Sequence, residues 1–251
     1  MISPQIEEVD SYLQAISGMP ANFPLKKADL LSISSRFLMQ EEGPLTMYYA
    51  PHNEVINTAA RVVIVGITPG WSQMKTALEA AKRAEIEGAS TEVMLKRAKQ
   101  SAGFAGSMRT HLIQMLDGIG ISSLFNLSSS AELFEERTDL LHTTSIIKYP
   151  IFKNGKNYTG HAPKMDRVEM LKPYIEKVFP EELSLIEGEY LLIPLGKAVG
   201  EILGQLAEVK KIRAERCLFG FPHPSGANGH RVSQFASEQE RLRSIVQAWK
   251  K

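Results

Sequence analysis

Short apolar runs, each ending at a glycine or proline turn, constrain the fold of this chain more than any other feature. The run Arg61–Gly66 reads RVVIVG, and further apolar runs occur at 142–149, 190–194 and 217–221. Such runs are typical of strands buried on both faces of a parallel sheet. Helical patterns separate the runs, so the sequence predicts an α/β fold. We expect a three-layer α/β/α sandwich with a central four-stranded parallel sheet.

Helices are expected around these strands. Apolar residues at helical spacing predict an N-terminal helix, and the Ala-, Lys- and Glu-rich stretch 72–101 predicts two helices that separate near Gly88. The other expected helices lie at about 27–39, 107–116, 166–179, 198–206 and 233–249. The sequence shows neither repeat nor linker, so we expect one domain over residues 1–251. It has a helical N-terminal extension at 1–60 and a helical insertion at 72–101.

Composition excludes some classes of protein without assigning one. The 251 residues carry a formal net charge of +1, which does not mark a nucleic-acid binder. Basic stretches around 96–99 and 210–216 are most simply explained as solvated helix faces. The single cysteine, Cys217, excludes an internal disulfide and a four-cysteine metal site. Because the sequence also lacks a signal-peptide pattern and an apolar run of roughly 20 residues, we expect a cytoplasmic protein.

Three loops combine glycine with candidate binding or catalytic residues. Gly66–Gly70 (GITPG) can aim backbone N–H groups into a pocket, although a tight strand-to-helix turn has the same pattern. Phe104 stands between glycines, where its ring can stack on a base or belong to the core. His223, in HPSG, can bond an oxygen that gains negative charge, and the loop can lie against phosphate. The first and third loops follow strands of one parallel sheet, so they are expected at the same edge.

Taken in order, five segments resemble motifs of the uracil-DNA glycosylase superfamily. GITPG resembles the first motif, which reads GINPG in the mismatch-specific branch and GEAPG in the iron–sulfur branch. SAGFAGSMRTHLIQMLDGIGI and HTTSIIKYP resemble the stacking-phenylalanine segment and the second strand of the iron–sulfur branch, where that strand reads ITNVVKCRP. LLIPLGKAV resembles the third strand with its Leu-Gly turn, and HPSGAN resembles the second catalytic motif. The resemblance covers about residues 61–231 and implies a single glycosylase-like domain.

The resemblance implies a DNA glycosylase that flips a base out of DNA and hydrolyses its N-glycosidic bond. Carried onto this chain, His223 stabilises the departing base anion, and Thr68 stands where other members position the attacking water. The implied base contacts are Ile67, Phe104 (by stacking), Ser145 and Trp71. The implied DNA contacts are Pro69, Gly70, Ser225, Gly226, Ala227, Asn228 and Arg231. Trp71 is equally well explained as a cover for the start of a helix.

Departures from the family pattern point to an altered substrate. Thr68 replaces a residue that orients water, and threonine is not a general base near neutral pH. Ser145 stands where an asparagine reads the uracil edge, and a serine cannot reproduce its paired hydrogen bonds. Ala227, at the wedge position, is too small to push a base out of the stack. We therefore expect a bulkier or modified base, such as a modified pyrimidine of phage DNA, and with it a role in phage defence.

No cofactor is expected. The four cluster cysteines of the iron–sulfur branch are absent, and His111, His142 and His161 form no metal-binding pattern. The expected partner is DNA, with no membrane and no metal cluster, and the protein is expected to be a monomer. Lys148 and Lys164 flank a polar loop and either touch phosphate or are solvated.

Two other functions stay open. Thr68 and Ser145 favour a catalytically silent DNA-binding relative of the same fold. An unrelated doubly wound enzyme acting on nucleotides or small phosphates would need a phosphate-cradling loop after the first strand. Neither GxGxxG nor GxxxxGK followed by Ser or Thr occurs there.

Overall fold

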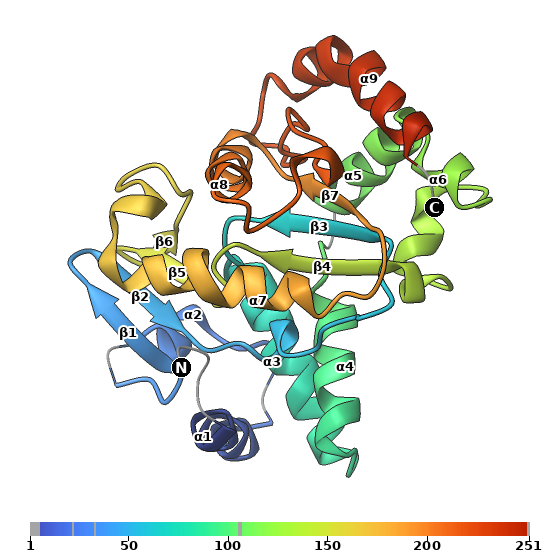
Figure 1. Cartoon of the computed structure of the whole chain (residues 1–251). Coiled ribbons are helices and arrows are strands. Elements are labelled where there is room, and N and C mark those ends of the chain that lie inside the picture. The colour runs from blue at the N-terminus through green and yellow to red at the C-terminus, as the bar shows by residue number, and fades with distance from the viewer. Residues whose placement is uncertain (1–5, 22, 33, 105–106, 250–251) are drawn as a thin grey trace. The chain divides into compact units, whose positions relative to one another are not determined.

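The structure, a computed structural model, describes residues 6–21, 23–32, 34–104 and 107–249. The chain forms two compact units, each of which is discontinuous in sequence. Unit 1 comprises Met1–Ile56, Ile67–Gly103 and Ser145–Glu182, and unit 2 comprises Asn57–Gly66, Phe104–Thr144 and Leu183–Lys251. The colours of Figure 1 locate these segments along the chain.

Unit 2 is built on a three-stranded parallel sheet with the order β4-β3-β7. β3 (Val62–Gly66) lies between β4 (Leu141–Ser145) and β7 (Leu191–Pro194), and its pairing with β7 runs in register from Val62↔Leu191 to Val65↔Pro194. All four residues from 62 to 65 are buried, so the prediction of a strand covered on both faces is confirmed. β4 ends earlier than the predicted run 142–149.

The predicted fourth strand at 217–221 is wrong. Cys217 makes an isolated parallel bridge to Leu192, and the Leu218 N–H donates to the Leu192 carbonyl at 2.8 Å. Gly220 then takes a left-handed φ of +86°, a conformation that glycine adopts without steric cost. The segment therefore leaves the sheet after one bridge and leads into His223.

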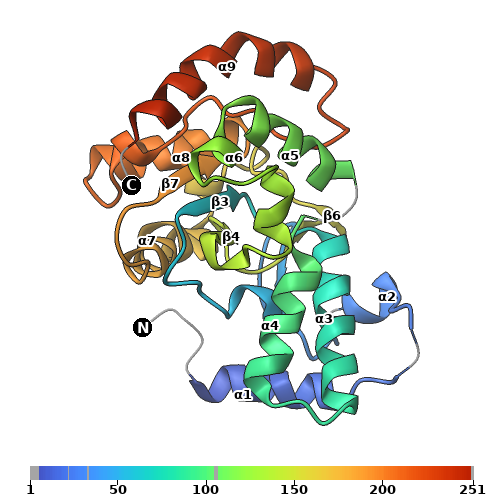
Figure 2. The same cartoon turned by 90° about the vertical axis from the view of Figure 1, so that its right-hand side faces the viewer.

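Helices pack on the sheet of unit 2 through one apolar cluster. α5 (Ser107–Gly118), α6 (Ile121–Leu124) and α9 (Arg231–Ala248) lie together on one side of the sheet (Figure 2), and α8 (Lys197–Glu208) packs against β7. The buried aliphatic members of the cluster include Val62, Ile64, Leu112, Leu116, Leu191, Ile193, Leu242 and Val246. Burying such a side chain contributes roughly 1.5–3 kcal/mol. The helices predicted at 107–116, 198–206 and 233–249 are confirmed to within two residues at each end.

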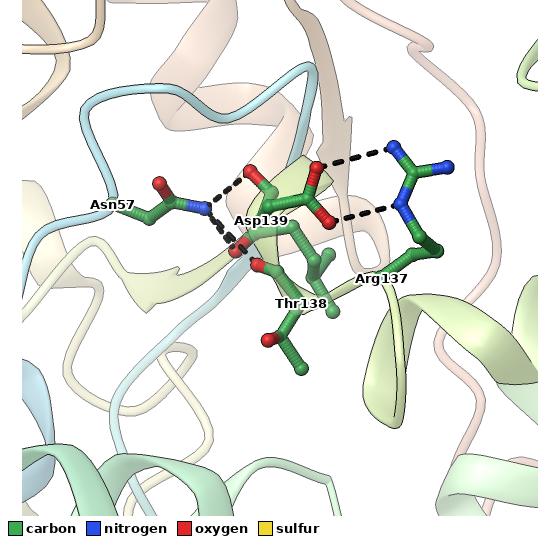
Figure 3. Close-up of polar contacts among 5 residues, drawn as sticks. Asn57, Arg137, Thr138 and Asp139 are labelled. Carbon is green, nitrogen blue, oxygen red and sulfur yellow. Dashed lines mark hydrogen bonds and ion pairs between the residues drawn. The ribbon is translucent and has the colours of Figure 1, made fainter.

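Hydrogen bonds from the Asn57 side chain to backbone carbonyls fix the start of β4 in unit 2. Asn57 Nδ2 donates to the carbonyls of Thr138, Asp139 and Leu141 at 3.1, 2.8 and 3.0 Å (Figure 3). Arg137 makes paired bonds with the Asp139 carboxylate at 3.0 and 3.1 Å. Asn57 precedes β3 closely in the chain, so its amide couples the entry into β3 to the entry into β4.

Unit 1 contains an antiparallel sheet that the sequence patterns do not predict. Its strand order is β1-β2-β5-β6. The strands are β1 (Leu38–Glu42), β2 (Leu45–Tyr48), β5 (Ile151–Lys153) and β6 (Lys156–Asn157). The helix predicted at 27–39 is therefore wrong, because α2 spans only Lys27–Leu30. Gly43 forms the β1–β2 turn with a left-handed φ of +56°, so the N-terminal extension is helical only in part.

The other helices of unit 1 confirm the predicted pair at 72–101. α3 (Trp71–Ile86) and α4 (Thr91–Ala102) lie side by side (Figure 2), and Gly88 turns between them with a φ of +75°. The Ser90 side chain caps α4 by accepting the Val93 N–H. α1 (Ile6–Ser17) packs against α3 and confirms the N-terminal helix.

Residues 165–184 do not form the single helix predicted at 166–179. Met165–Arg167 and Glu169–Leu171 are 3₁₀ turns, Tyr174–Val178 is a π-helical turn, and α7 spans Phe179–Ser184. Pro173 lacks an N–H, and the Glu42 carboxylate accepts the Met170 N–H at 2.7 Å, so a strand residue rather than a continuing helix satisfies this backbone. The other 3₁₀ turns are Pro51–Asn53, Ser130–Phe134, Thr138–Leu140 and Ala214–Arg216. Of the helices in the described residues, none is long and apolar enough to cross a bilayer.

Candidate functional site

The loop that follows Phe221 in unit 2 is fixed by side chains that bind three consecutive backbone carbonyls. The bonds run from Asn228 Nδ2 to the His223 carbonyl (3.2 Å), from His111 Nδ1 to the Pro224 carbonyl (3.0 Å) and from Arg231 Nη1 to the Ser225 carbonyl (3.0 Å). Backbone groups that are satisfied inside the protein hold the loop in one conformation. The loop is therefore arranged before any ligand arrives.

The conformation of this loop determines which nitrogen of the His223 ring carries the proton. The Ser225 N–H donates to His223 Nδ1 at 3.2 Å, so the proton of the neutral ring is carried by Nε2. Burial lowers the pKa of His223 from its ordinary value, which favours the neutral ring near pH 7. Nε2 has no hydrogen-bond partner within the described part of the chain. The ring is thus a neutral donor that is open to a ligand oxygen.

His223 lines a cavity of about 520 Å³ in unit 2, a size within the range of small-ligand sites. Lys197, Asn228 and Gln234 supply polar walls from α8, the loop and α9. Gly196, at the start of α8, has a φ of +87°, and a Cβ there would lie 3.0 Å from His223 Cβ. The glycine therefore allows the turn after β7 to touch the histidine.

Phe104 lies in the hydrophobic core of unit 2 and is not part of this cavity's lining. Its side chain is 7% exposed, and its left-handed φ of +37° is unusual for a bulky residue. Arg109 Nε holds the Phe104 carbonyl at 2.9 Å. Ala105 and Gly106, which continue this predicted motif, lie outside the described residues. Strained backbone of this kind concentrates at functional sites, and stacking of Phe104 on a base stays a prediction.

The GITPG loop is held within unit 1 by the hydroxyl of Thr68. Thr68 Oγ1 donates to the Tyr149 carbonyl at 2.7 Å and accepts the Ile151 N–H at 3.0 Å, while the Ile67 carbonyl accepts the Ile147 N–H at 3.0 Å. The single hydroxyl proton is therefore used inside the protein, and only a lone pair is left for water. The geometry makes Thr68 a bridge between its loop and residues 149–151. Its predicted role in catalysis stays a prediction.

Removing this bridge should destabilise the protein. Thr68→Val keeps the shape of the side chain but leaves the Tyr149 carbonyl and the Ile151 N–H without their partner, at an expected cost of about 1–3 kcal/mol. Thr68→Ser retains the hydroxyl and should cost less. Urea denaturation measures both variants. Equal unfolding free energies for Thr68→Val and the wild type would show that the bridge contributes nothing to stability.

The rest of the first motif lies at the start of α3. The Gly70 N–H donates to Gln73 Oε1 at 3.2 Å, and the Trp71 N–H donates to Asn157 Oδ1 at 2.9 Å. A Cβ on Gly70 would lie 3.0 Å from Asn157 Nδ2, so glycine permits this approach of β6. The centroid of the half-buried Trp71 ring lies 5.9 Å from Lys27 Nζ, close enough for a cation–π contact at the first residue of α3.

The other predicted contacts differ in how accessible they are. In unit 1, Pro69 is buried and Ser145 is 7% exposed. In unit 2, Ser225 Oγ accepts the Ala227 N–H at 3.1 Å and so shapes the loop, as the Asn228 and Arg231 side chains also do. Gly226 and Ala227 are exposed, and the Gly226 N–H has no partner among the residues described. An exposed amide of this kind can bind phosphate.

Sequence similarity places the chain in a family. It is 47% identical over 238 residues to the uncharacterized protein YoxB of Bacillus subtilis (strain 168), and the alignment covers 95% of this chain and 91% of YoxB. The chain belongs to the YoxB family. No family model matches it, and no solved structure matches it. Membership of the YoxB family assigns no activity to the chain.

This YoxB-family chain also buries a polar cluster in unit 1 that sequence patterns do not reveal. Lys148 Nζ pairs with Glu54 Oε2 at 2.7 Å, and the two side chains are only 9% and 11% exposed. Tyr149 Oη donates to Glu54 Oε1 at 2.8 Å, and Asn53 Nδ2 donates to the Lys148 carbonyl at 2.9 Å. Because the Tyr149 carbonyl also accepts the Thr68 hydroxyl, a series of contacts links Glu54 to the GITPG loop. Lys148 is therefore a buried ion-pair partner rather than a surface lysine.

His52, in the turn Pro51–Asn53 of the same unit, is a second buried polar group. Its side chain is 4% exposed, and neither ring nitrogen has a partner among the residues that the structure describes. Burial, with a smaller effect from the charge of Lys99, lowers the pKa of His52 from 6.5 to about 3. The unfolded chain therefore binds a proton that the folded chain does not. The stability that His52 contributes is complete above pH 6.5 and is lost as the pH falls towards 3.

Replacing His52 should flatten the pH dependence of stability. From pH 6.5 to pH 5, the wild type should lose roughly 2 kcal/mol of unfolding free energy that His52→Phe does not lose, since each pH unit is worth about 1.4 kcal/mol. Urea denaturation at the two pH values measures this loss. His230→Asn, which removes an exposed histidine, is the control. Parallel pH slopes for the wild type and His52→Phe would contradict the prediction.

Over the described ranges, no group of three or more His, Cys, Asp and Glu side chains is arranged to hold a metal ion. Cys217 is a buried free thiol, and burial raises its pKa to about 12. A thiol with so high a pKa is a poor nucleophile near neutral pH.

Proposed function

We propose that the chain is a DNA glycosylase that hydrolyses the N-glycosidic bond of a flipped base and leaves an abasic site. The observation that carries the proposal is the His223 ring, which is neutral, protonated at Nε2 and held in a prearranged loop. When the bond to a base breaks, negative charge develops on a carbonyl oxygen of the base. A fixed donor aimed at that oxygen binds the transition state more strongly than the ground state.

The proposed architecture is the three-layer sandwich of the uracil-DNA glycosylase superfamily. The order of β3, the turn after β7 and the HPSG loop agrees with the order of that family's motifs. The contact of Gly196 with His223 supports the proposal further, because it brings two of these motifs together within unit 2. We place the activity on cytoplasmic DNA, with the protein acting as a monomer.

The proposed substrate is a bulkier or modified pyrimidine such as phage DNA contains. Ser145 is too short to reproduce paired hydrogen bonds to the edge of uracil, and discrimination by such bonds is steep. The exposed Gly226 and Ala227 lie at the tip of the loop, where the Gly226 amide can bind a phosphate of the same strand. A protein that excises such a base would attack phage DNA and leave unmodified DNA intact.

A panel of oligonucleotides tests the proposal. Each carries one uracil, one 5-substituted pyrimidine or one alkylated purine, as a single strand and as a duplex, and alkali then cleaves at any abasic site. We expect cleavage at a 5-substituted pyrimidine that matches the amount of base released. Efficient release of uracil alone would overturn the substrate assignment, and release from no DNA would overturn the activity.

Phe104 gives a prediction for base binding. Phe104→Leu keeps an apolar side chain in the core but removes the flat ring, so we expect the rate of release to fall roughly 10- to 100-fold. Phe104→Tyr retains the aromatic face and should retain most of the activity. Single-turnover release assays compare the variants. Full activity of Phe104→Leu would mean that the ring does not stack on the base.

A catalytically silent DNA-binding relative is the second candidate. The observation in its favour is Thr68, whose hydroxyl proton is already donated to the Tyr149 carbonyl. Fluorescence anisotropy with the same oligonucleotides separates the two functions. Binding without release across the whole panel would favour the silent relative.

A further inference from the structure

The peptide group that joins Pro224 to Ser225 lies between two histidines of unit 2. At one end, His111 Nδ1 lies 3.0 Å from the Pro224 carbonyl oxygen. At the other end, the Ser225 N–H donates to His223 Nδ1 at 3.2 Å. This carbonyl and this N–H belong to the same planar amide. Sequence patterns gave no role to His111.

We propose that His111 is a positioning residue that acts on His223 through the Pro224–Ser225 peptide group, an inference that rests on the proposed function. A carbonyl oxygen only accepts hydrogen bonds, so His111 Nδ1 carries a proton and is the donor. Hydrogen bonds in a chain polarise one another, so an amide whose oxygen accepts a bond donates more strongly through its N–H. His111 therefore strengthens the bond to His223 Nδ1.

This bond decides which nitrogen of His223 carries the proton. With Nδ1 occupied as an acceptor, the proton stays on Nε2, the atom that the proposed reaction uses as a donor. Asn228 and Arg231 bind the neighbouring carbonyls at 223 and 225, whereas His111 binds the carbonyl of the 224–225 peptide itself. Pro224 is buried, so solvent is a poor substitute for the imidazole.

The helix that carries His111 also holds Phe104. Arg109, two residues earlier on α5, donates from Nε to the Phe104 carbonyl at 2.9 Å. One helix therefore braces both the segment with the predicted stacking ring and the loop with the predicted donor. A shift of α5 would change both together.

Nuclear magnetic resonance of the histidine nitrogens tests the proposal without DNA. In the wild type at pH 7.5, we expect a proton on His111 Nδ1 and an unprotonated His223 Nδ1. In His111→Phe, the His223 nitrogen resonances should move towards the average of the two tautomers. His111→Asn restores a donor near the Nδ1 position and should restore the wild-type resonances. Thr110→Ala, an exposed change on the same helix, is the control and should leave them unchanged.

The release assay supplies the second readout. We expect His111→Phe to slow base release by roughly 10-fold, the lower end of the loss that follows when the outer hydrogen-bond partner of a metal-bound histidine is removed, and His111→Asn to recover much of the rate. Unchanged His223 resonances and an unchanged rate in His111→Phe would overturn the inference while the glycosylase proposal stands. If the His223 resonances change in His111→Phe but the wild type releases no base, the glycosylase proposal is overturned. The link from His111 to His223 through the Pro224–Ser225 peptide group would then still stand. An unprotonated His111 Nδ1 in the wild type would overturn the inference even if His111→Phe does not fold.

Discussion

Replacing His223 with alanine should lower the rate of base release by at least about 100-fold, because a prearranged donor to a developing anion is typically worth 10²–10³ in rate. The variant loses the Nε2 donor while Asn228, His111 and Arg231 still hold the loop through backbone carbonyls. We therefore expect the loss to appear in the chemical step measured by single-turnover kinetics, with binding of DNA largely retained.

A matched variant distinguishes a loss of catalysis from a loss of folded protein. His230→Ala removes an exposed histidine near the end of the same loop and should release base at the wild-type rate. Because burial lowers the pKa of His223, the wild-type rate should persist below pH 6.5 and fall only when the ring is protonated. A His223→Ala enzyme as fast as the His230→Ala control would remove the central support of the glycosylase proposal.

Replacing Glu54 with glutamine should destabilise the protein by about 3–5 kcal/mol, since it leaves the buried Lys148 ammonium without its ion-pair partner. The Lys148 side chain is only 9% exposed, so water compensates poorly. A loss of this size is a large fraction of the roughly 5–15 kcal/mol that stabilises a typical domain. Urea and thermal denaturation of the variant measure the cost.

The chain provides a matched comparison for this ion pair. Lys96 and Glu92 are also 2.7 Å apart, but their side chains are 57% and 75% exposed, so Glu92→Gln should be nearly neutral. The double variant Glu54→Gln/Lys148→Met removes both charges and should recover much of the stability that Glu54→Gln loses. If Glu54→Gln and Glu92→Gln lower the free energy of unfolding by equally small amounts, burial does not determine how much the Lys148–Glu54 ion pair contributes to stability.

Features with local sequence signals could be predicted. The run at 61–66 is β-branched and apolar throughout, and it forms β3 at the centre of the parallel sheet. Gly88 separates α3 from α4 as expected, because a glycine in the left-handed conformation ends the first helix and Ser90 then caps the second. His223 and Gly196 were recognisable because each stands at a turn directly after an apolar run.

Features that depend on distant partners could not be predicted. β1 reads LMQEE without a clear alternation, and the antiparallel sheet is completed by β5, more than a hundred residues later. The run at 217–221 has a strand composition, yet the conformation of Gly220 ends its pairing after one bridge. Likewise, the sequence around His111 is that of an ordinary amphipathic helix, and only the packing of α5 brings its ring to the Pro224 carbonyl.

Segments of the two units alternate along the chain, and this order affects both the truncation of the protein and its synthesis. Neither unit corresponds to one continuous stretch, so every truncation inside the chain removes part of at least one unit. During synthesis, β3 emerges from the ribosome more than a hundred residues before β7, its parallel neighbour. Its other parallel neighbour, β4, also follows more than seventy residues after β3, so the nascent chain carries β3 without a strand partner over that shorter interval, and chaperone dependence during translation is an expected property of this protein.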